Sequence, residues 1–402
     1  MKVLYDYQIF EMQKFGGISR IFYELMSHFG RSNSVQWKLP IRYSENEYLN
    51  TLPYFEGKLS SKPVQVDPLK NFLGDKSFRG KRILYQLKNR VLPLSRQENF
   101  TDFNKQLSIK ELQKGEFDIF HPTYYDPYFL EYIGDKPFVI TVYDLIHQVF
   151  PEFFMDISYP DKNATMLQRA TKILAISEST KKDLVNIFGI DEKKIIVTYL
   201  ANSLRESSEI SQQKDILKLP DQYILCVGHR NIYKNFYFFI QAITPLLKTK
   251  PDLFVVCTGI QFNEDEKRYL AKLGISEKVL HCYVDDRQLA NLYHRALVFA
   301  FPSLYEGFGL PILEAFSCSC PVITSNSSSL PEVGGDAVVY FEPKNARSIL
   351  DALTSIVDNI DLRQKKINKG YEQLKRFSWQ KTALETESVY AQVLSQKLMM
   401  SD

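Results

Sequence analysis

Two glutamates, Glu306 and Glu314, stand on either side of a glycine-containing turn and have the spacing that most suggests chemistry in this chain. The apolar run before them, residues 297–302, is typical of a buried parallel strand that ends in a turn. Because proline suits a first helical position, we expect a helix to begin at Pro311 and to carry Glu314 on its first turn. The backbone N–H groups of residues 307–310 would then lie at a helix N-terminus, which binds anions. Two carboxylates beside an anion site suit a ligand that carries both phosphate and hydroxyl groups.

A nucleotide sugar is a ligand of this kind, but turn geometry alone is an alternative interpretation. A Gly-x-Gly after a strand is often only a tight turn, and the helix dipole favours glutamates near a helix start whatever their function. The turn therefore has to be judged together with the rest of the chain.

A second turn with suitable chemistry contains Arg230 and Lys234, within the segment 227–235 between a predicted strand and a predicted helix. An arginine fork matches the oxygens of a phosphate, and a lysine adds a compact point charge. Together the two side chains could neutralise a diphosphate without a metal ion. A solvated basic turn is the alternative interpretation.

Near the N-terminus, Gly16 and Gly17 follow the first predicted strand and open a helix. Paired glycines allow the backbone to approach a ligand closely, and the helix end favours negative charge. Neither this pair nor Gly307-Phe308-Gly309 has the third glycine of a dinucleotide fingerprint. A Rossmann dehydrogenase is therefore disfavoured.

Polar residues also follow a very apolar predicted strand that ends near Tyr143. Asp144 or His147 could hydrogen-bond sugar hydroxyls or handle a proton. The alternatives are that Asp144 caps a helix and that His147 only packs. The other histidines show no metal spacing, and a catalytic serine elbow and a Walker loop are both absent from the sequence.

Length and composition fit a globular protein of two domains, because 402 residues exceed what one hydrophobic core usually supports. The chain is 45% hydrophobic and 24% charged, with a formal net charge of +3. The segment 58–96 carries +8, which leaves −5 on the remainder. Apolar residues are interleaved with these charges, which suits a surface helix on anionic lipid, an ordinary solvated helix or a nucleic-acid contact.

The five cysteines favour buried, reduced thiols in a cytosolic protein, since three stand in apolar strand-like runs and no second pair supports a zinc site. The first residues turn polar too soon for a signal peptide. No apolar run approaches the ~20 residues of a membrane span. We therefore expect a cytoplasmic protein that can lie peripherally on the inner face of the membrane.

Short apolar runs alternate with longer helical patterns, which predicts an α/β protein with parallel sheets. The predicted strands are 2–5, 37–43, 118–121, 138–143, 172–177, 195–199, 223–227, 253–258, 279–283, 297–301, 321–324 and 337–341. The predicted helices are 17–29, 161–170, 178–188, 236–248, 264–273, 286–296, 311–317, 346–357, 362–375 and 379–397. A polar stretch, 202–218, reads as a linker between two doubly wound domains with a cleft between them.

Taken together, these residues resemble family 4 of the retaining glycosyltransferases, in particular the bacterial surface-polysaccharide, mannosyltransferase-like branch. The resemblance covers nearly the whole chain, and its matching segments are 15–20, 175–179, 228–235, 306–314, 331–337 and 377–379. It implies the GT-B fold of two facing Rossmann-like domains. Residues 1–202 would bind the acceptor and 203–379 the nucleotide sugar, with a helix at 380–402 packing back on the first domain.

The resemblance also implies roles for individual residues. Arg230 and Lys234 would grip the donor diphosphate, and Gly16 and Gly17 would close over it from the opposite domain. Glu314 would hold the ribose hydroxyls, while Glu306 would contact the transferred sugar. The backbone amides of Phe308, Gly309 and Leu310 would face the phosphate and sugar.

One position departs from the family pattern. Many members have a histidine before the aspartate that matches Asp144, and that histidine touches the donor sugar. Here Tyr143 stands in its place, so it is open which of Tyr143, Asp144 and His147 assists the reaction.

The expected reaction is transfer of a hexose, mannose-like by resemblance, from a nucleotide diphosphate to a glycan or polyprenyl-diphosphate-linked glycan in O-antigen or capsule synthesis. Retention at the anomeric carbon is expected, with neither a cofactor nor a metal ion. An epimerase or phosphorylase of the same architecture is an alternative, although no pyridoxal-binding lysine region is evident. A nucleic-acid-binding protein that uses the basic segment is less favoured, because the glutamate pair would then have no role.

Overall fold

The computed structural model describes residues 1–55, 57, 59, 100–154, 160–204, 219–230 and 232–399. The predicted basic segment 58–96 lies outside these residues except for Leu59, and so does most of the predicted linker. Contacts divide the chain into two compact units, Met1–Val139 and Ile140–Asp402. The domain boundary expected near residue 202 stays a prediction.

The first unit is built on a three-stranded parallel sheet with β1 in the middle. The order is β2 (Gln36–Lys38), β1 (Lys2–Tyr5), β3 (Ile119–His121). The predicted strand 37–43 is too long, because Pro40 has no N–H for the sheet ladder and the strand ends at Lys38. Within the described residues of this unit, the α-helices are α1 (Gln8–Met12), α2 (Gly17–Ser32) and α5 (Phe100–Lys114).

A smaller sheet follows at the start of the second unit, in the order β4 (Val139–Val142), β5 (Lys172–Ala175), β6 (Ile195–Val197), and only its first residue, Val139, belongs to the first unit. All four residues of β4 are buried, which explains the apolar run that predicted it. The helices of this part are α6 (Ile146–Val149), α7 (Pro160–Arg169) and α8 (Glu178–Phe188). Ser177 caps α8 by accepting a hydrogen bond from the Thr180 N–H.

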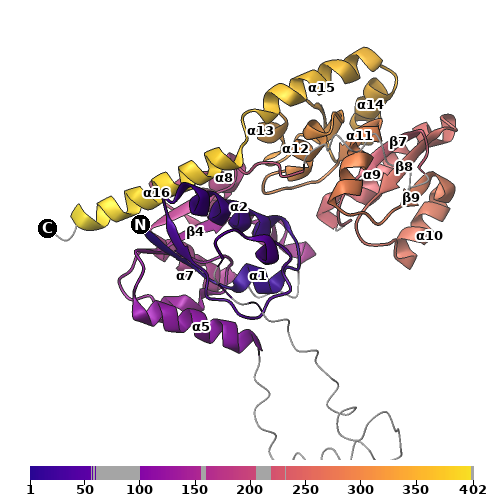
Figure 1. The fold of residues 1–402 in the computed structure, drawn as a ribbon. Helices are drawn as coiled ribbons and strands as arrows, with labels where there is room; N and C mark the ends of the chain where they lie inside the picture. The colour runs from indigo at the N-terminus through magenta and orange to yellow at the C-terminus, as the bar shows by residue number, and fades with distance from the viewer. Residues whose placement is uncertain are drawn as a thin grey trace, which may run out of the picture. The chain divides into compact units, whose positions relative to one another are not determined.

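The rest of the second unit is built on a six-stranded parallel sheet in the order β12-β11-β10-β7-β8-β9. Figure 1 labels three of these strands, β7, β8 and β9. From β7 the chain moves outward through β8 to β9, and it then returns to β10 on the other side of β7. The switch point of the sheet therefore lies between β7 and β10. The strands are β7 (Gln222–Cys226), β8 (Leu253–Cys257), β9 (Val279–His281), β10 (Val298–Phe301), β11 (Val322–Ser325) and β12 (Val339–Phe341).

Helices with one apolar face cover this sheet, and α9 packs against α14 through residues that are fully buried, among them Ile243 and Leu353. Asn263 and Asp285 start α10 and α11 with capping boxes. The helices are α9 (Phe236–Thr249), α10 (Glu264–Leu273), α11 (Asp286–Arg295), α12 (Leu310–Ser317), α13 (Leu330–Gly334), α14 (Ala346–Val357) and α15 (Ile360–Leu374).

The last helix, α16 (Trp379–Met399), packs against β5. The Thr382 hydroxyl donates a hydrogen bond to the carbonyl of Tyr199 at 2.6 Å, and the Trp379 indole donates to the Ser203 hydroxyl at 2.8 Å. In the part of the chain that the structure describes, no helix combines the length and apolarity needed to span a bilayer.

Candidate functional site

The candidate site lies at the switch point of the six-stranded sheet, where the loops after β7 and β10 leave neighbouring strands. The first loop carries Lys234 and the second carries Glu306. The Lys234 Nζ lies 2.6 Å from the Glu306 Oε1, and the two side chains are 23% and 14% exposed. A backbone hydrogen bond from the Leu304 N–H to the Tyr233 carbonyl, 2.8 Å long, also joins the loops. The fold thus pairs two residues that the sequence analysis assigned to different parts of one ligand.

The surroundings of Lys234 keep its ammonium group charged. Burial has the largest single effect and acts to lower the pKa of Lys234, but Glu306, Tyr233 and Asp144 together outweigh burial and the net pKa is raised. The ammonium also lies 5.2 Å from the centre of the Tyr233 ring and 5.5 Å from that of Phe301. A fixed positive charge at the carboxyl ends of parallel strands is suited to an anionic ligand.

The turn after Glu306 requires glycine for steric reasons. A Cβ atom built on Gly307 would lie 1.8 Å from the carbonyl oxygen of Tyr143, a distance that no pair of non-bonded atoms can adopt. Gly309 has φ +118°, a left-handed conformation that favours glycine, and it caps α12. The Ser329 hydroxyl lies 2.9 Å from the Glu306 carbonyl and 2.7 Å from that of Phe308. The loop is therefore held in one conformation by its neighbours.

The start of α12 differs from the prediction by one residue. The helix begins at Leu310, so Pro311 is its second residue, and Glu314 is the fifth and lies in the second turn instead of the first. The missing proline N–H still costs nothing, because the first four N–H groups of a helix have no partner within it. Phe308 is buried, with 3% of the residue exposed, and contact of its backbone amide with a donor stays a prediction.

Glu314 is oriented by a residue that sequence reasoning missed. The Tyr293 hydroxyl, on α11, donates a hydrogen bond to the Glu314 Oε2 at 3.0 Å. Tyr293 is fully buried, and burial followed by the Glu314 charge raises its pKa well above the usual value. The phenol therefore stays neutral and acts as a donor to the carboxylate.

The three polar residues predicted after β4 have different environments, and Tyr143 is the one whose burial is plain, at 4% exposed. The Asp144 Oδ1 accepts a hydrogen bond from the Ile146 N–H at 3.1 Å, the pattern of an Asx turn, while the N-cap of α6 is Leu145. Burial raises the pKa of Asp144 and Glu306 raises it further, whereas the Ile146 N–H, His147 and Lys234 lower it. The His147 ring packs on Phe154, with centroids 4.0 Å apart. Asp144 thus lies within electrostatic range of the Lys234–Glu306 pair.

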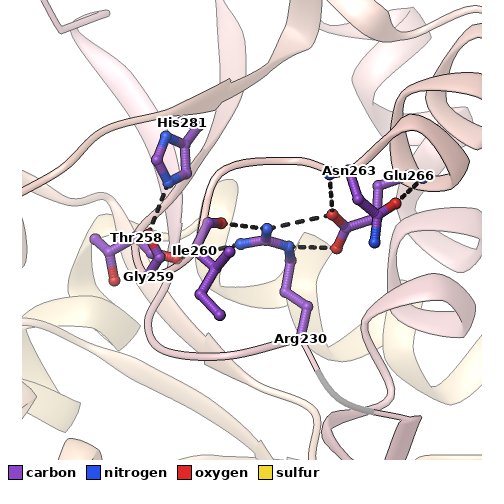
Figure 2. Close-up of polar contacts among 7 residues, drawn as sticks. All are labelled: Arg230, Thr258, Gly259, Ile260, Asn263, Glu266 and His281. Carbon is purple, nitrogen blue, oxygen red and sulfur yellow. Dashed lines mark hydrogen bonds and ion pairs between the residues drawn. The ribbon is translucent and has the colours of Figure 1, made fainter. Parts of the chain in front are cut away.

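Arg230 contacts the carboxylate of Glu266 (Figure 2), whereas Lys234 contacts that of Glu306. Its Nε lies 2.6 Å from the Glu266 Oε1 and its Nη2 lies 3.3 Å from the Glu266 Oε2. It also donates to the carbonyls of Thr258 and Ile260. The guanidinium carbon lies 4.5 Å from the centroid of the Phe262 ring, and the arginine side chain is only 7% exposed. This arginine holds the loop after β8 in place, and its contact with a diphosphate stays a prediction.

Arg230→Lys is expected to lower the free energy of unfolding by about 1–3 kcal/mol, because lysine keeps the charge but cannot make the forked set of hydrogen bonds. Urea unfolding measures the change. Arg347→Lys is the matched control, since Arg347 is 80% exposed and pairs with Asp351 in solvent. Equal stability of the two variants would contradict this assignment of Arg230.

Gly16 and Gly17 lie in the first unit, where α2 begins at Gly17. The Gln13 Oε1 accepts a hydrogen bond from the Ser19 N–H at 3.1 Å and would lie 2.5 Å from a Cβ on Gly16. The glutamine side chain therefore caps α2. Closure of this turn over a diphosphate stays a prediction.

Sequence reasoning also missed the aromatic residues beside the Lys234–Glu306 pair. The ring centroids of Phe150 and Tyr305 lie 6.2 Å apart, and Tyr305 precedes Glu306. Those of Phe154 and Tyr233 lie 6.4 Å apart, and Tyr233 precedes Lys234. The signal was present in the sequence, since residues 150–154 contain three phenylalanines. In the described part of the chain, no cluster of three or more His, Cys, Asp or Glu residues could hold a metal ion.

Comparison with known proteins adds a second line of evidence. The model described as "Glycosyltransferase Family 4" matches residues 60–201, and that described as "Glycosyl transferases group 1" matches residues 207–373. O-antigen chain mannosyltransferase B of Escherichia coli is 32% identical over 285 residues, which is 68% of this chain and 74% of that protein. O-antigen chain mannosyltransferase RfbU of Salmonella typhimurium is 27% identical over 219 residues, 54% of this chain and 60% of that protein.

A further relative, from Campylobacter jejuni, is N-acetylgalactosamine-N,N'-diacetylbacillosaminyl-diphospho-undecaprenol 4-alpha-N-acetylgalactosaminyltransferase. It is 30% identical over 251 residues, 61% of this chain and 65% of that protein.

Solved structures resemble the whole chain. Anabaena HepE bound to UDP and glucose has a TM-score of 0.68 and 15% identity, covering 97% of this chain and 99% of that one. A glycosyltransferase from Rickettsia africae has a TM-score of 0.67 and 17% identity, covering 98% of each chain. At such low identity the likeness concerns the fold alone. Since these neighbours are GT-B glycosyltransferases, the predicted GT-B fold is confirmed.

Proposed function

The chain belongs to the family 4 glycosyltransferases, and we propose that it transfers a hexose, with mannose favoured, from a nucleotide-diphosphate sugar to a saccharide acceptor. The Lys234–Glu306 pair at the switch point is the observation that carries this proposal. Ligands of open parallel sheets bind outside the strand ends at such a point. A cation for the diphosphate and a carboxylate for the sugar hydroxyls stand there 2.6 Å apart.

The proposed chemistry relies on charges that are in place before the reaction begins. As the sugar leaves, negative charge develops on the diphosphate, near Lys234 and the N-terminus of α12. Preorganised charges and dipoles of this kind are usually the largest catalytic contribution. Glu306 would hold the sugar hydroxyls, and Glu314 would hold the ribose. The proposed reaction proceeds with retention and without a separate metal ion.

The acceptor is proposed to be a glycan, or a glycan linked to a polyprenyl diphosphate, in O-antigen or capsule synthesis. The names of the relatives support this proposal, since two are O-antigen mannosyltransferases and the third names a diphospho-undecaprenol acceptor. A lipid-linked acceptor would bring the enzyme to the cytoplasmic face of the membrane. Peripheral attachment of the enzyme to that face of the membrane is part of the same proposal.

A transfer assay tests the proposed function. Purified protein would be given radiolabelled GDP-mannose, UDP-hexoses or UDP-N-acetylhexosamines, each with a polyprenyl-diphosphate-linked glycan. The expected result is incorporation of label from one donor, unchanged by a chelator, with the anomeric configuration of the donor retained in the product. Release of a free isomerised sugar would instead identify an epimerase, and an absence of turnover with every donor would contradict the proposal.

Tyr293→Phe is expected to weaken donor binding about fivefold with kcat little changed, because one hydrogen bond that orients Glu314 is worth about 1 kcal/mol. Calorimetric titration with the donor measures the effect. Tyr223→Phe is the matched control, because it removes a buried hydroxyl that donates to the Leu292 carbonyl instead of to Glu314. Equal affinities in the two variants would show that Tyr293 does not act through Glu314.

A further inference from the structure

Glu332, on the short helix α13, has no role in the proposed reaction. Its carboxylate nevertheless accepts hydrogen bonds from a helix that lies more than 150 residues earlier in the chain. The Glu178 N–H donates to its Oε2 at 2.9 Å and the Ser179 N–H donates to its Oε1 at 3.1 Å. The Tyr199 hydroxyl donates to the Oε2 at 3.2 Å. These two N–H groups belong to the first turn of α8, where backbone donors have no partner inside the helix.

The same end of α8 also holds the loop that carries Glu306. The Thr180 hydroxyl donates to the Gly307 carbonyl at 3.3 Å, on the C-terminal side of Glu306. On its N-terminal side, the Tyr305 hydroxyl donates to the Asp183 Oδ2 at 2.7 Å. The residues before and after Glu306 in the sequence are therefore both hydrogen-bonded to the first two turns of α8. A movement of α8 would displace the loop.

A carboxylate is well suited to fix such a helix end. Hydrogen bonds from backbone N–H groups to an ionised carboxylate are about twice as strong as neutral ones, and negative charge is favoured at a helix N-terminus. A glutamine at position 332 would keep one acceptor oxygen, but its NH2 group would face an N–H donor. The bidentate contact therefore requires a carboxylate.

We propose that Glu332 is a positioning residue for the transfer reaction: it fixes the first turn of α8, and α8 fixes the loop that carries Glu306. The inference rests on the proposed function, because it needs a reaction in which Glu306 takes part. It goes beyond that function by giving Glu332 an effect on turnover without any contact with the donor.

The test compares Glu332→Gln with Glu372→Gln, a matched control on α15 whose carboxylate pairs with Lys375 in solvent. Glu332→Gln is expected to lower kcat about tenfold to a hundredfold while the donor KM changes little, because misplacement of about 1 Å has effects of this size. Glu332→Asp, which keeps the charge, should recover part of the loss. A merely structural role would lower the melting temperature and leave kcat per folded molecule unchanged, and that result would overturn the proposal.

Amide hydrogen exchange at Glu178 and Ser179 separates this inference from the proposed function, because it needs no turnover. Both amides should exchange faster in Glu332→Gln than in the wild type and in Glu372→Gln. Unchanged exchange would overturn the proposed clamp on α8 even in an active enzyme. Faster exchange in a protein that turns over no donor would show that the proposed function, and with it the positioning role, is wrong while the contact is real.

Discussion

Lys234→Ala is expected to lower kcat/KM for the nucleotide-sugar donor by about 10²–10³-fold, the usual effect of removing one preorganised group that stabilises charge in the transition state. The variant removes the ammonium that lies 2.6 Å from Glu306 and leaves that carboxylate without its cation. Loss of the cation also places an uncompensated negative charge where the diphosphate should bind. Steady-state kinetics with the donor identified in the transfer assay measures the change.

Lys250→Ala is the control for this experiment. Lys250 also forms an ion pair, with Asp358 at 2.7 Å, but its side chain is 37% exposed and its partner is 49% exposed. Because exposed pairs contribute little, this variant should keep wild-type kinetics. If Lys234→Ala also kept them, the anion site would not be at the switch point.

Gly307→Ala is the second substitution with a large expected effect. The new Cβ would lie 1.8 Å from the Tyr143 carbonyl oxygen, so the loop that carries Glu306 must move away from the segment after β4. Displacement of a positioning loop by about 1 Å is expected to lower kcat about 100-fold. Donor kinetics and the circular dichroism spectrum together distinguish a displaced loop from an unfolded protein.

The matched control is Gly134→Ala. Gly134 has φ +58° with no atom within 4 Å of a built Cβ, so alanine there is strained but not obstructed. Its expected effect is a loss of about 1 kcal/mol of stability with unchanged kinetics. Activity of Gly307→Ala that equals the activity of this control would show that the close approach to Tyr143 is unimportant.

Several helix positions could be read from the sequence where a cap marks the start, although α15, which Asn359 caps, begins at Ile360 and not at the predicted residue 362. The bounds of α8, α10 and α14 agree with the prediction, because Ser177, Asn263 and Asn345 cap them with side chains of the expected type. By contrast, α1 and α13 have five residues each, which is too short for a periodic pattern, and both were missed. The fifteen-residue α5 was missed as well.

The contacts within the candidate site were harder to predict than its members. Lys234 and Glu306 were both singled out, but their ion pair depends on β7 and β10 being neighbours, which the order of strands decides. The pairing of Arg230 with Glu266 depends in the same way on where the loop after β8 lies. No periodicity reveals such contacts, because they join residues that are distant in the sequence.

The most direct test of the central claim, that the switch point binds a nucleotide sugar, is a calorimetric titration of the protein with GDP-mannose, the donor favoured here. We expect saturable 1:1 binding to the wild type, unchanged by a chelator, and binding at least tenfold weaker to Glu314→Ala, because the ribose hydroxyls lose a charged acceptor. Equal affinity of the wild type and Glu314→Ala, or no binding by the wild type, would contradict the account.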